Sequence, residues 1–419
     1  MLLAFSSSAN AQTCDRSPLL IFNVSVWTPD GPIAGRDVIV RDGRIESVLA
    51  SGSARPNVTR SIDGAGHTLL PGLIDSHLHF SVPGGLPDPP RRDTDQITGR
   101  QMLRAGVTSG RLHLASLEDA IRLKKQSIDP CAEMPRLQVG GPGLSGAQEK
   151  DFAAFQGARS IAEAIDKVET FAAAGVDWLA VHDGQHFAAG ILDAIAATAR
   201  RVGVRLMASG STPEELAAAI SIDPDTLDYF DRTTSAGYLQ PLLDGIRQRK
   251  NTIIVPTPGV PYRIVEYTKH PERLAEAQNF SLFSSADRAF VLANATKEIG
   301  GAEAKRYADV VPTIANKLRQ LRSLGLPVAI GSDAGSTMQF QANAIWWEME
   351  AWRAAGVTHR EVIAAATING ARVLRRDDVG HLRHGARADF VLYRGNAEEG
   401  AFDVDRVAAV AKDGVLIRR

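Results

Sequence analysis

The chain has 419 residues, of which 44% are hydrophobic and 23% charged, a composition that excludes a disordered chain, a fibre and a disulfide-rich miniprotein. Its 47 Lys and Arg nearly balance its 48 Asp and Glu, and its apolar runs are shorter than the roughly 18 residues that a membrane helix needs. We therefore expect neither nucleic acid nor a membrane span, and a small-molecule substrate is the partner to look for.

The N-terminus indicates export. A short apolar start is followed by serines and by Ala9-Asn10-Ala11, an A-x-A pattern typical of a signal-peptidase site. We interpret residues 1–12 as the remnant of a signal peptide and predict a periplasmic or secreted protein, the alternative being the loose end of a cytoplasmic one. Cys14 and Cys131 are either two buried thiols or one long-range disulfide, and export favours the disulfide.

Both ends of the chain have the pattern of small antiparallel strands. Residues 18–68 alternate β-branched runs with Asp-Gly turns, and the tail repeats this pattern in residues 389–393 and 407–417. We predict that residues 13–68 and 376–419 together form one β-sandwich domain.

Between these ends the pattern changes to strand followed by helix. Strand-like runs at residues 178–181, 204–208, 227–230 and 252–255 alternate with helical segments, which favours βαβ units and a parallel sheet. Eight inner strands fit between Leu69 and Asp333. The prediction is therefore an α/β fold in which residues 69–375 form a (β/α)8 TIM-like barrel, with its chemistry at the carboxyl ends of the strands.

Two histidines and an aspartate stand at the ends of predicted barrel strands. His77 and His79 end an apolar strand, and because strand side chains repeat with period two, both imidazoles leave the same face and can converge on one cation. Alone, such a pair also fits half-exposed strand histidines. Asp333 closes the last strand as a metal ligand or general base, or else caps the helix that follows.

At these motifs the chain resembles the metal-dependent hydrolase (amidohydrolase) superfamily, in its imidazolonepropionase-like branch. The resemblance spans nearly the whole chain and implies the barrel, a small β-domain and hydrolysis at a metal centre. It is carried by residues 70–79, 105–108, 255–257, 331–335, 365–371 and 380–389.

The resemblance also implies that the metal site is incomplete. The family's two-metal centre uses a lysine on strand four and histidines ending strands five and six, and the matching positions here are Ala180, Ser209 and Arg232. We therefore expect one divalent metal, with zinc the first candidate, or none. The expected ligands are His77, His79 and Asp333.

Arg232 restores about the charge that the second metal and its bridging carbamate would have supplied. A guanidinium binds a carboxylate through two parallel hydrogen bonds, so Arg232 either holds a substrate carboxylate or pairs with Asp231 or Asp333. A structural ion pair is the competing interpretation.

Further candidates come from the loops that follow the strands. His182 lies two residues beyond Ala180 on the same strand face and is either a ligand or proton carrier, or a hydrogen-bonded histidine of the barrel rim. His113 ends strand two and is a candidate for lining the mouth. Ser209 and Tyr238 are predicted to contact substrate, with aromatic packing as the alternative for Tyr238.

Three functional hypotheses follow. The first is a metal-dependent hydrolase of a carbon–nitrogen bond, amide or dipeptide-like, in which Asp333 shuttles the proton to the leaving nitrogen. The second is a metal-independent lyase, isomerase or cyclase that uses Asp333 and a histidine as acid and base. The third is a non-catalytic binding protein on the same fold. The sequence leaves open whether the chain forms a homo-oligomer.

Overall fold

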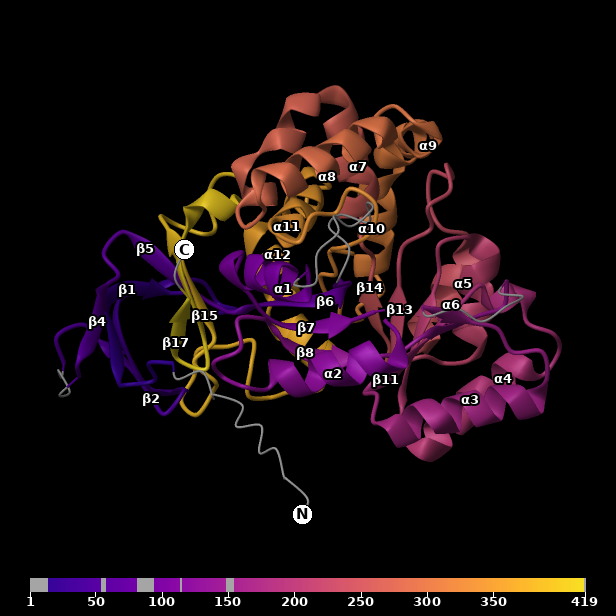
Figure 1. Ribbon diagram of the computed structural model, residues 1–419, viewed down its shortest axis with the longest axis horizontal. Coiled ribbons are helices and arrows are strands. Elements are labelled where there is room, and N and C mark those ends of the chain that lie inside the picture. Colours follow the sequence, from indigo (N-terminus) through magenta and orange to yellow (C-terminus); the bar gives the residue numbers. More distant parts are fainter. Residues whose placement is uncertain (1–13, 54–57, 81–93, 114, 148–153, 418–419) are drawn as a thin grey trace, which may run out of the picture.

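The computed structural model describes residues 14–53, 58–80, 94–113, 115–147 and 154–417. It consists of a sheet built from both ends of the chain and an α/β barrel built from the middle, which Figure 1 shows with the sheet on the left. The segment interpreted as a signal remnant, residues 1–12, lies outside the described residues.

The two chain ends meet in one sheet, as the strand pattern predicts. Strand β5 pairs in parallel with β1 on one side and antiparallel with β15 on the other, so the N- and C-terminal strands share one ladder. The sheet has eight strands: β1 (Leu19–Val26), β2 (Ile33–Arg41), β3 (Arg44–Ala50), β4 (Arg60–Asp63), β5 (His67–Pro71), β15 (Phe390–Arg394), β16 (Val407–Lys412) and β17 (Val415–Ile417).

The described strands form one continuous hydrogen-bonded sheet, because β5 bridges the two sets, and its strands enclose a core separate from that of the barrel. The sheet also extends to Pro71, so the barrel begins after the predicted boundary at residue 69.

The barrel is closed by eight parallel segments. The segment 327–334 lies between β14 and β6, where bridges join Ile254 to Val328 and Leu78 to Ala334. Seven segments contain regular strands: β6 (Leu73–Leu78), β7 (Val107–Leu112), β8 (Arg136–Val139) continuing into β9 (Gly143–Ser145), β11 (Trp178–His182), β12 (Arg205–Ser209), β13 (Thr226–Asp228) and β14 (Ile253–Val255). A short strand, β10 (Phe155–Gln156), pairs with β9.

Helices surround the barrel and cover its last strands. The group α7 to α9 follows the seventh strand and lies at the top of Figure 1. None of the helices in the described ranges is long and apolar enough to span a membrane. The helices are α1 (Thr94–Arg104), α2 (Leu117–Ser127), α3 (Ile161–Ala174), α4 (Ile191–Val202), α5 (Pro213–Ser221), α6 (Gln240–Gln248), α7 (Gly259–Lys269), α8 (Ser285–Glu298), α9 (Ala302–Val310), α10 (Ile314–Arg322), α11 (Ala344–Ala354), α12 (His359–Ala365) and α13 (Ile368–Val373).

The loop between α2 and β8 is held to the sheet at two points. Cys131 in this loop forms a disulfide with Cys14, with Cα atoms 5.4 Å apart, so of the two alternatives the structure has the disulfide. The buried ammonium of Lys412 on β16 lies 2.9–3.1 Å from four carbonyl oxygens, one at the end of α2 and three in this loop. The Cys14–Cys131 disulfide and the Lys412 ammonium therefore both hold this barrel loop to the sheet domain.

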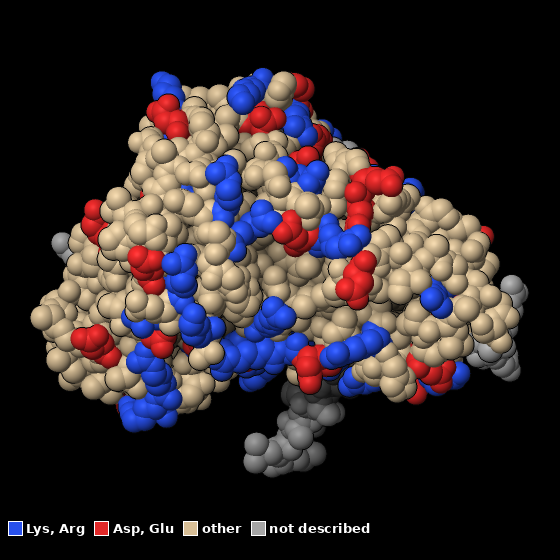
Figure 2. All heavy atoms as spheres, turned by 180° about the vertical axis from the view of Figure 1, so that it is seen from behind, with Lys and Arg blue, Asp and Glu red and all other residues tan. Residues whose placement is uncertain are grey.

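The surface carries charges of both signs. On the face shown in Figure 2, Lys and Arg are interspersed with Asp and Glu, and a band of basic side chains crosses its lower middle. This distribution agrees with the nearly neutral net charge of the sequence.

Candidate active site

His77, His79 and Asp333 meet at the carboxyl ends of the first and last barrel segments, as predicted. Oδ1 of Asp333 lies 3.5 Å from Nε2 of His77 and 3.0 Å from Nε2 of His79, and one ligand atom from each residue lies within 4.8 Å of the others. Ligand atoms of a tetrahedral zinc site with bonds of about 2.1 Å are about 3.4 Å apart. The three side chains are therefore spaced as ligands of one small divalent ion.

The other ring nitrogens of the two histidines are oriented by fixed acceptors. Nδ1 of His77 lies 2.7 Å from a carboxylate oxygen of Asp228, and Nδ1 of His79 lies 3.0 Å from the carbonyl oxygen of His113. Such partners hold the Nδ1–H tautomer, which leaves Nε2 free to bind a metal. Burial lowers the pKa of His77, so its imidazole is neutral as a ligand requires. The donor set thus fits the metal that the family implies.

Asp228 is the functional residue that the sequence analysis missed as a partner of His77. It ends β13 fully buried, and its Oδ2 accepts hydrogen bonds from both His77 and the guanidinium of Arg111, at 2.7 and 2.5 Å. Arg111 crosses the barrel interior from β7 and also donates to Thr226 Oγ1 and to the carbonyl oxygen of Ser76. Burial opposes ionisation of Asp228, but the charge of Arg111 and the bond from His77 hold its pKa below the ordinary value.

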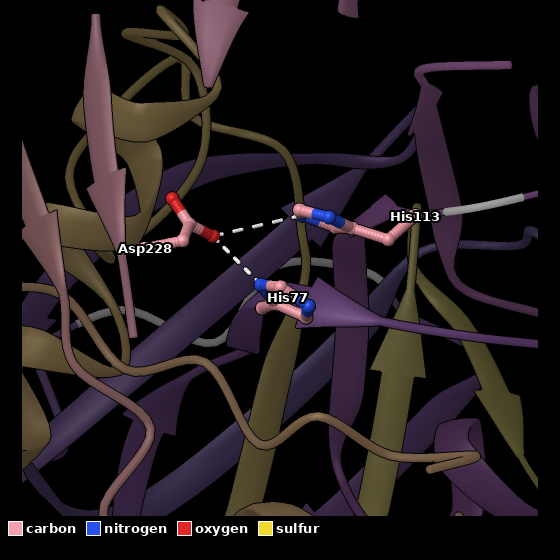
Figure 3. Close-up of side chains that lie close together, drawn as sticks. All are labelled: His77, His113 and Asp228. Atoms are coloured by element: carbon pink, nitrogen blue, oxygen red, sulfur yellow. Dashed lines mark hydrogen bonds and ion pairs between the residues drawn. The ribbon is translucent and has the colours of Figure 1, made fainter. Parts of the chain in front are cut away.

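His113 lies behind His77 instead of lining the mouth. Its ring stacks on that of His77 with centroids 3.5 Å apart and contacts Trp178 on β11. Figure 3 shows Asp228 facing both imidazoles, with His113 Nε2 at the longer distance of 3.7 Å. Neither ring nitrogen of His113 has a hydrogen-bond partner in the described structure, and burial lowers its pKa well below 6.5. His113 is therefore a neutral packing residue under the site.

Arg232 reaches the mouth from beyond the end of β13. One Nη lies 3.7 Å from Asp333 Oδ2 and donates to Thr257 Oγ1 at 2.9 Å, while its Nε is buried without a partner in the described structure. Of the two predicted pairings the structure has the one with Asp333, because Asp231 faces Lys317 at 3.5 Å. The guanidinium lies over the ring of Tyr229 at 4.4 Å.

Tyr229, not Arg232, directly follows the sixth strand. Its hydroxyl lies 3.0 Å from Nε2 of His77 and so competes with a metal for that nitrogen. Burial raises its pKa well above the ordinary value, so the hydroxyl remains protonated. The sequence analysis placed Arg232 at the end of this strand, but the strand already ends at Asp228. The side chains of Tyr229 and Arg232 both reach the mouth.

Four residues that follow barrel segments adopt the left-handed backbone region. Asp183, Tyr229, Thr257 and Asp333 have φ values of 51°, 67°, 49° and 55°. For the β-branched Thr257 and the bulky Tyr229 this conformation is unfavourable, and such strain is concentrated at functional sites. The side chains of Tyr229 and Asp333 both approach Nε2 of His77, and Arg232 contacts both Thr257 and Asp333.

Asp333 is kept ionised by its neighbours. Burial alone would raise its pKa, but the contacts of its carboxylate with His79 and His77 and the positive charge of Arg232 hold that pKa well below its ordinary value. The carboxylate is therefore available as a ligand or as a proton acceptor at neutral pH.

The remaining predicted residues have different surroundings. His182 ends β11, and its Nε2 is buried without a hydrogen-bond partner among the described residues. Its ring lies 6.4 Å from that of Tyr229, so it faces the mouth. It does not belong to the described groups of side chains that are spaced to hold a metal ion. Ser209 is buried at the end of β12, level with Asp228. The Tyr238 hydroxyl accepts a hydrogen bond from the backbone N–H of Asp231, so its place is in the packing of the loop that carries Arg232.

Ala180 stands where the two-metal centre of the family has its bridging lysine. Ala180 is buried in an apolar cluster with Trp178 and Met207, against which Tyr229 packs. A second metal therefore has no lysine bridge here, and His182 lies outside the groups that the described His, Cys, Asp and Glu residues form.

Comparisons with known proteins show the family of the chain. The sequence model described as "Amidohydrolase family" matches residues 68–417. The chain is 28% identical over 405 residues to an imidazolonepropionase of Mycolicibacterium smegmatis, covering 93% of this chain and 92% of that protein, and 24% identical over 380 residues to one of Streptomyces avermitilis, covering 87% and 82%.

Solved structures show the same fold. A Xaa-Pro dipeptidase with bound methionine superposes with a TM-score of 0.74 at 20% identity, covering 96% of this chain and all of that one. A molinate hydrolase superposes with a TM-score of 0.72 at 18% identity, covering 97% and 95%. From its sequence and its barrel, the chain belongs to the amidohydrolase family and is a hydrolase of carbon–nitrogen bonds.

Proposed function

We propose that this hydrolase cleaves an amide or dipeptide-like bond of a small molecule that carries a carboxylate, with one divalent metal bound by His77, His79 and Asp333. The observation that carries the proposal is the spacing of these three ligand atoms together with the acceptors that fix both imidazoles.

A divalent ion at this position would lower the pKa of a bound water and polarise the scissile carbonyl. Zinc suits two imidazoles and one carboxylate. The protein's part is to hold His77 and His79 in one tautomer and to keep Arg111 and Asp228 beneath them as a neutral pair.

Asp333 would move the proton. Its low pKa makes it a carboxylate, so it can accept the proton of the attacking water at one oxygen and deliver it to the leaving nitrogen. Its Oδ2 faces Arg232 at 3.7 Å, and this charge stabilises the ionised form of Asp333 before the first transfer and after the second.

Arg232 would bind the substrate carboxylate. Its buried Nε has no partner in the described structure, and a free Nε beside an Nη is the pair of donors that a carboxylate accepts bidentately. The imidazolonepropionase relatives and the dipeptidase neighbour are proteins whose names describe hydrolysis of C–N bonds in small molecules, which supports this substrate class.

Two contacts favour a second candidate, a metal-independent lyase, isomerase or cyclase. Arg232 brings a fixed positive charge next to Asp333, and the Tyr229 hydroxyl already contacts Nε2 of His77. Both contacts oppose a cation, and both would suit proton transfer between Asp333 and a histidine.

Metal analysis separates the two candidates. Protein purified without chelator should contain about one equivalent of zinc, manganese or iron and should hydrolyse some of a panel of N-acyl amino acids, dipeptides and lactams. Protein with far less metal, and no gain of activity when these ions are added, would exclude the metal-dependent mechanism. Turnover lost in Asp333→Asn with ligand binding intact would then favour the second candidate.

We also propose that the protein works outside the cytoplasm. The Cys14–Cys131 disulfide is of a kind that persists in oxidising compartments, and Ala9-Asn10-Ala11 precedes Cys14 by three residues. Fractionation of a producing cell, with the N-terminal residue of the mature protein determined by mass spectrometry, tests both parts of this proposal.

A further inference from the structure

The hydroxyl of Tyr229 occupies the place on His77 that a metal needs. Asp228 accepts the Nδ1–H of His77 at 2.7 Å, a contact that Figure 3 shows, so Nε2 of this neutral ring offers a lone pair and no proton. The Tyr229 hydroxyl lies 3.0 Å from Nε2 and is therefore the donor of this hydrogen bond. One lone pair cannot bind a hydroxyl proton and a cation together, so metal binding has to displace the hydroxyl.

The ring of Tyr229 is held in place, so the displaced hydroxyl stays at the mouth. The guanidinium of Arg232 lies over the ring at 4.4 Å, and the ring packs against the apolar cluster around Trp178. The backbone N–H of Tyr229 donates to the carbonyl oxygen of Val255 at 2.9 Å, which fixes the left-handed turn with its φ of 67°. Only a small rotation of the side chain is left to the hydroxyl.

This rotation places the hydroxyl beside the position that a substrate would take. Zinc binds an imidazole nitrogen at about 2.0–2.1 Å, which is shorter than the 3.0 Å between Nε2 and the hydroxyl oxygen, so the oxygen has to withdraw toward the mouth. Tyr229 is partly exposed there, between the side chains of His79 and Arg232, which are 15% and 14% exposed. A substrate can therefore reach the hydroxyl.

We propose that Tyr229 is a catalytic residue: after it has given up Nε2 of His77 to a metal, its hydroxyl donates a hydrogen bond to the oxygen of the scissile carbonyl. That oxygen gains negative charge as water adds to the carbonyl carbon, and a fixed donor stabilises this charge. The proton stays on the tyrosine oxygen, because the proton of the water goes to Asp333. The positive charge of Arg232 over the ring makes the hydroxyl a stronger donor. This inference rests on the proposed function.

Zinc affinity, measured by competition with a chelator, and steady-state kinetics of Tyr229→Phe test the proposal. Loss of the hydroxyl leaves Nε2 of His77 without its donor, so zinc should bind about three- to tenfold more tightly. On an amide or dipeptide that the parent protein hydrolyses, kcat should nonetheless fall about 100-fold or more with little change in KM, since a donor to the developing charge is lost. A merely structural role would not combine tighter zinc binding with slower turnover.

Tyr262→Phe on α7 is the matched control. The ring of Tyr262 lies 6.2 Å from that of Trp347, and we expect zinc affinity and kcat equal to those of the parent. Zinc should also perturb the tyrosine absorption of the parent and of Tyr262→Phe, but not that of Tyr229→Phe, because Tyr229 is the tyrosine whose hydroxyl zinc displaces.

Three results for Tyr229→Phe would overturn the proposal. Unchanged zinc affinity would show that the hydroxyl does not compete for Nε2, weaker affinity would make Tyr229 a metal ligand, and unchanged kcat would leave it no part in turnover. Each of these leaves the proposed function intact, since the parent still binds metal and hydrolyses its substrate. A parent protein that binds no zinc would instead refute the proposed function, and this inference with it, before any variant is compared.

Discussion

Replacement of Asp228 by Asn should damage both the scaffold and the metal site. Asp228 is fully buried and its carboxylate is shared between Arg111, 3% exposed, and His77. Loss of its charge leaves the Arg111 guanidinium buried and uncompensated, and removing one member of a buried pair costs about 3–5 kcal/mol in the free energy of unfolding. The same change replaces the charged acceptor that orients His77 by a neutral amide oxygen, and mutation of such a partner weakens metal binding about 10- to 100-fold.

Urea denaturation and competition with a chelator measure these two effects separately. Adding Arg111→Met to Asp228→Asn removes the stranded charge and should restore part of the stability, while metal affinity stays low because His77 still lacks its carboxylate. Asp244→Asn, whose 49% exposed side chain pairs with Arg247 at 3.0 Å, is the control and should cost no more than about 1 kcal/mol. Normal stability and metal affinity in Asp228→Asn, or metal affinity that returns together with stability in the double variant, would refute this reasoning.

Other predictions concern the substrate, the pH response and the disulfide. Arg232→Lys should lower kcat/KM for a carboxylate substrate about 10- to 100-fold and barely affect its neutral amide, because Lys keeps the charge but not the paired donors; equal losses for both substrates would indicate a structural role. Burial lowers the pKa of His77, His113 and His182 below 6.5, so these imidazoles stay neutral when the unfolded chain takes up protons. The metal-free protein should therefore lose stability as pH falls below about 6.5, by up to about 1.4 kcal/mol per pH unit for each group. His113→Phe should make melting temperature less dependent on pH in that range, and an unchanged slope would contradict the assignment. The joint change of Cys14 and Cys131 to Ser should cost about 2–4 kcal/mol, measured as the free energy of unfolding, and reducing agent should destabilise only the parent protein; no difference between the two would show that the bond contributes little.

Local sequence patterns predict most of the fold and the centre of the site. Strands from both ends of the chain share one sheet, and His77 and His79 converge because alternation along one strand is a local property. Asp333 joins them because the carboxyl ends of parallel strands meet at one end of the barrel.

The contacts beneath the metal ligands depend on register across the barrel and are not predictable in this way. Arg111 and Asp228 are 117 residues apart, and their pairing follows from how β7 and β13 are staggered, which no spacing in the sequence states. In the sequence, Arg111 and Asp228 each resemble an ordinary polar residue near the end of a strand. The single sheet is likewise set by β5 pairing on both of its edges.

Two different links hold the loop between α2 and β8, a disulfide and a set of hydrogen bonds from Lys412. Thiol chemistry can undo the link between Cys14 and Cys131, whereas the four carbonyls gathered by Lys412 do not respond to redox conditions. Reduction of the disulfide would therefore remove one of the two links between this loop and the sheet and leave the Lys412 contacts in place.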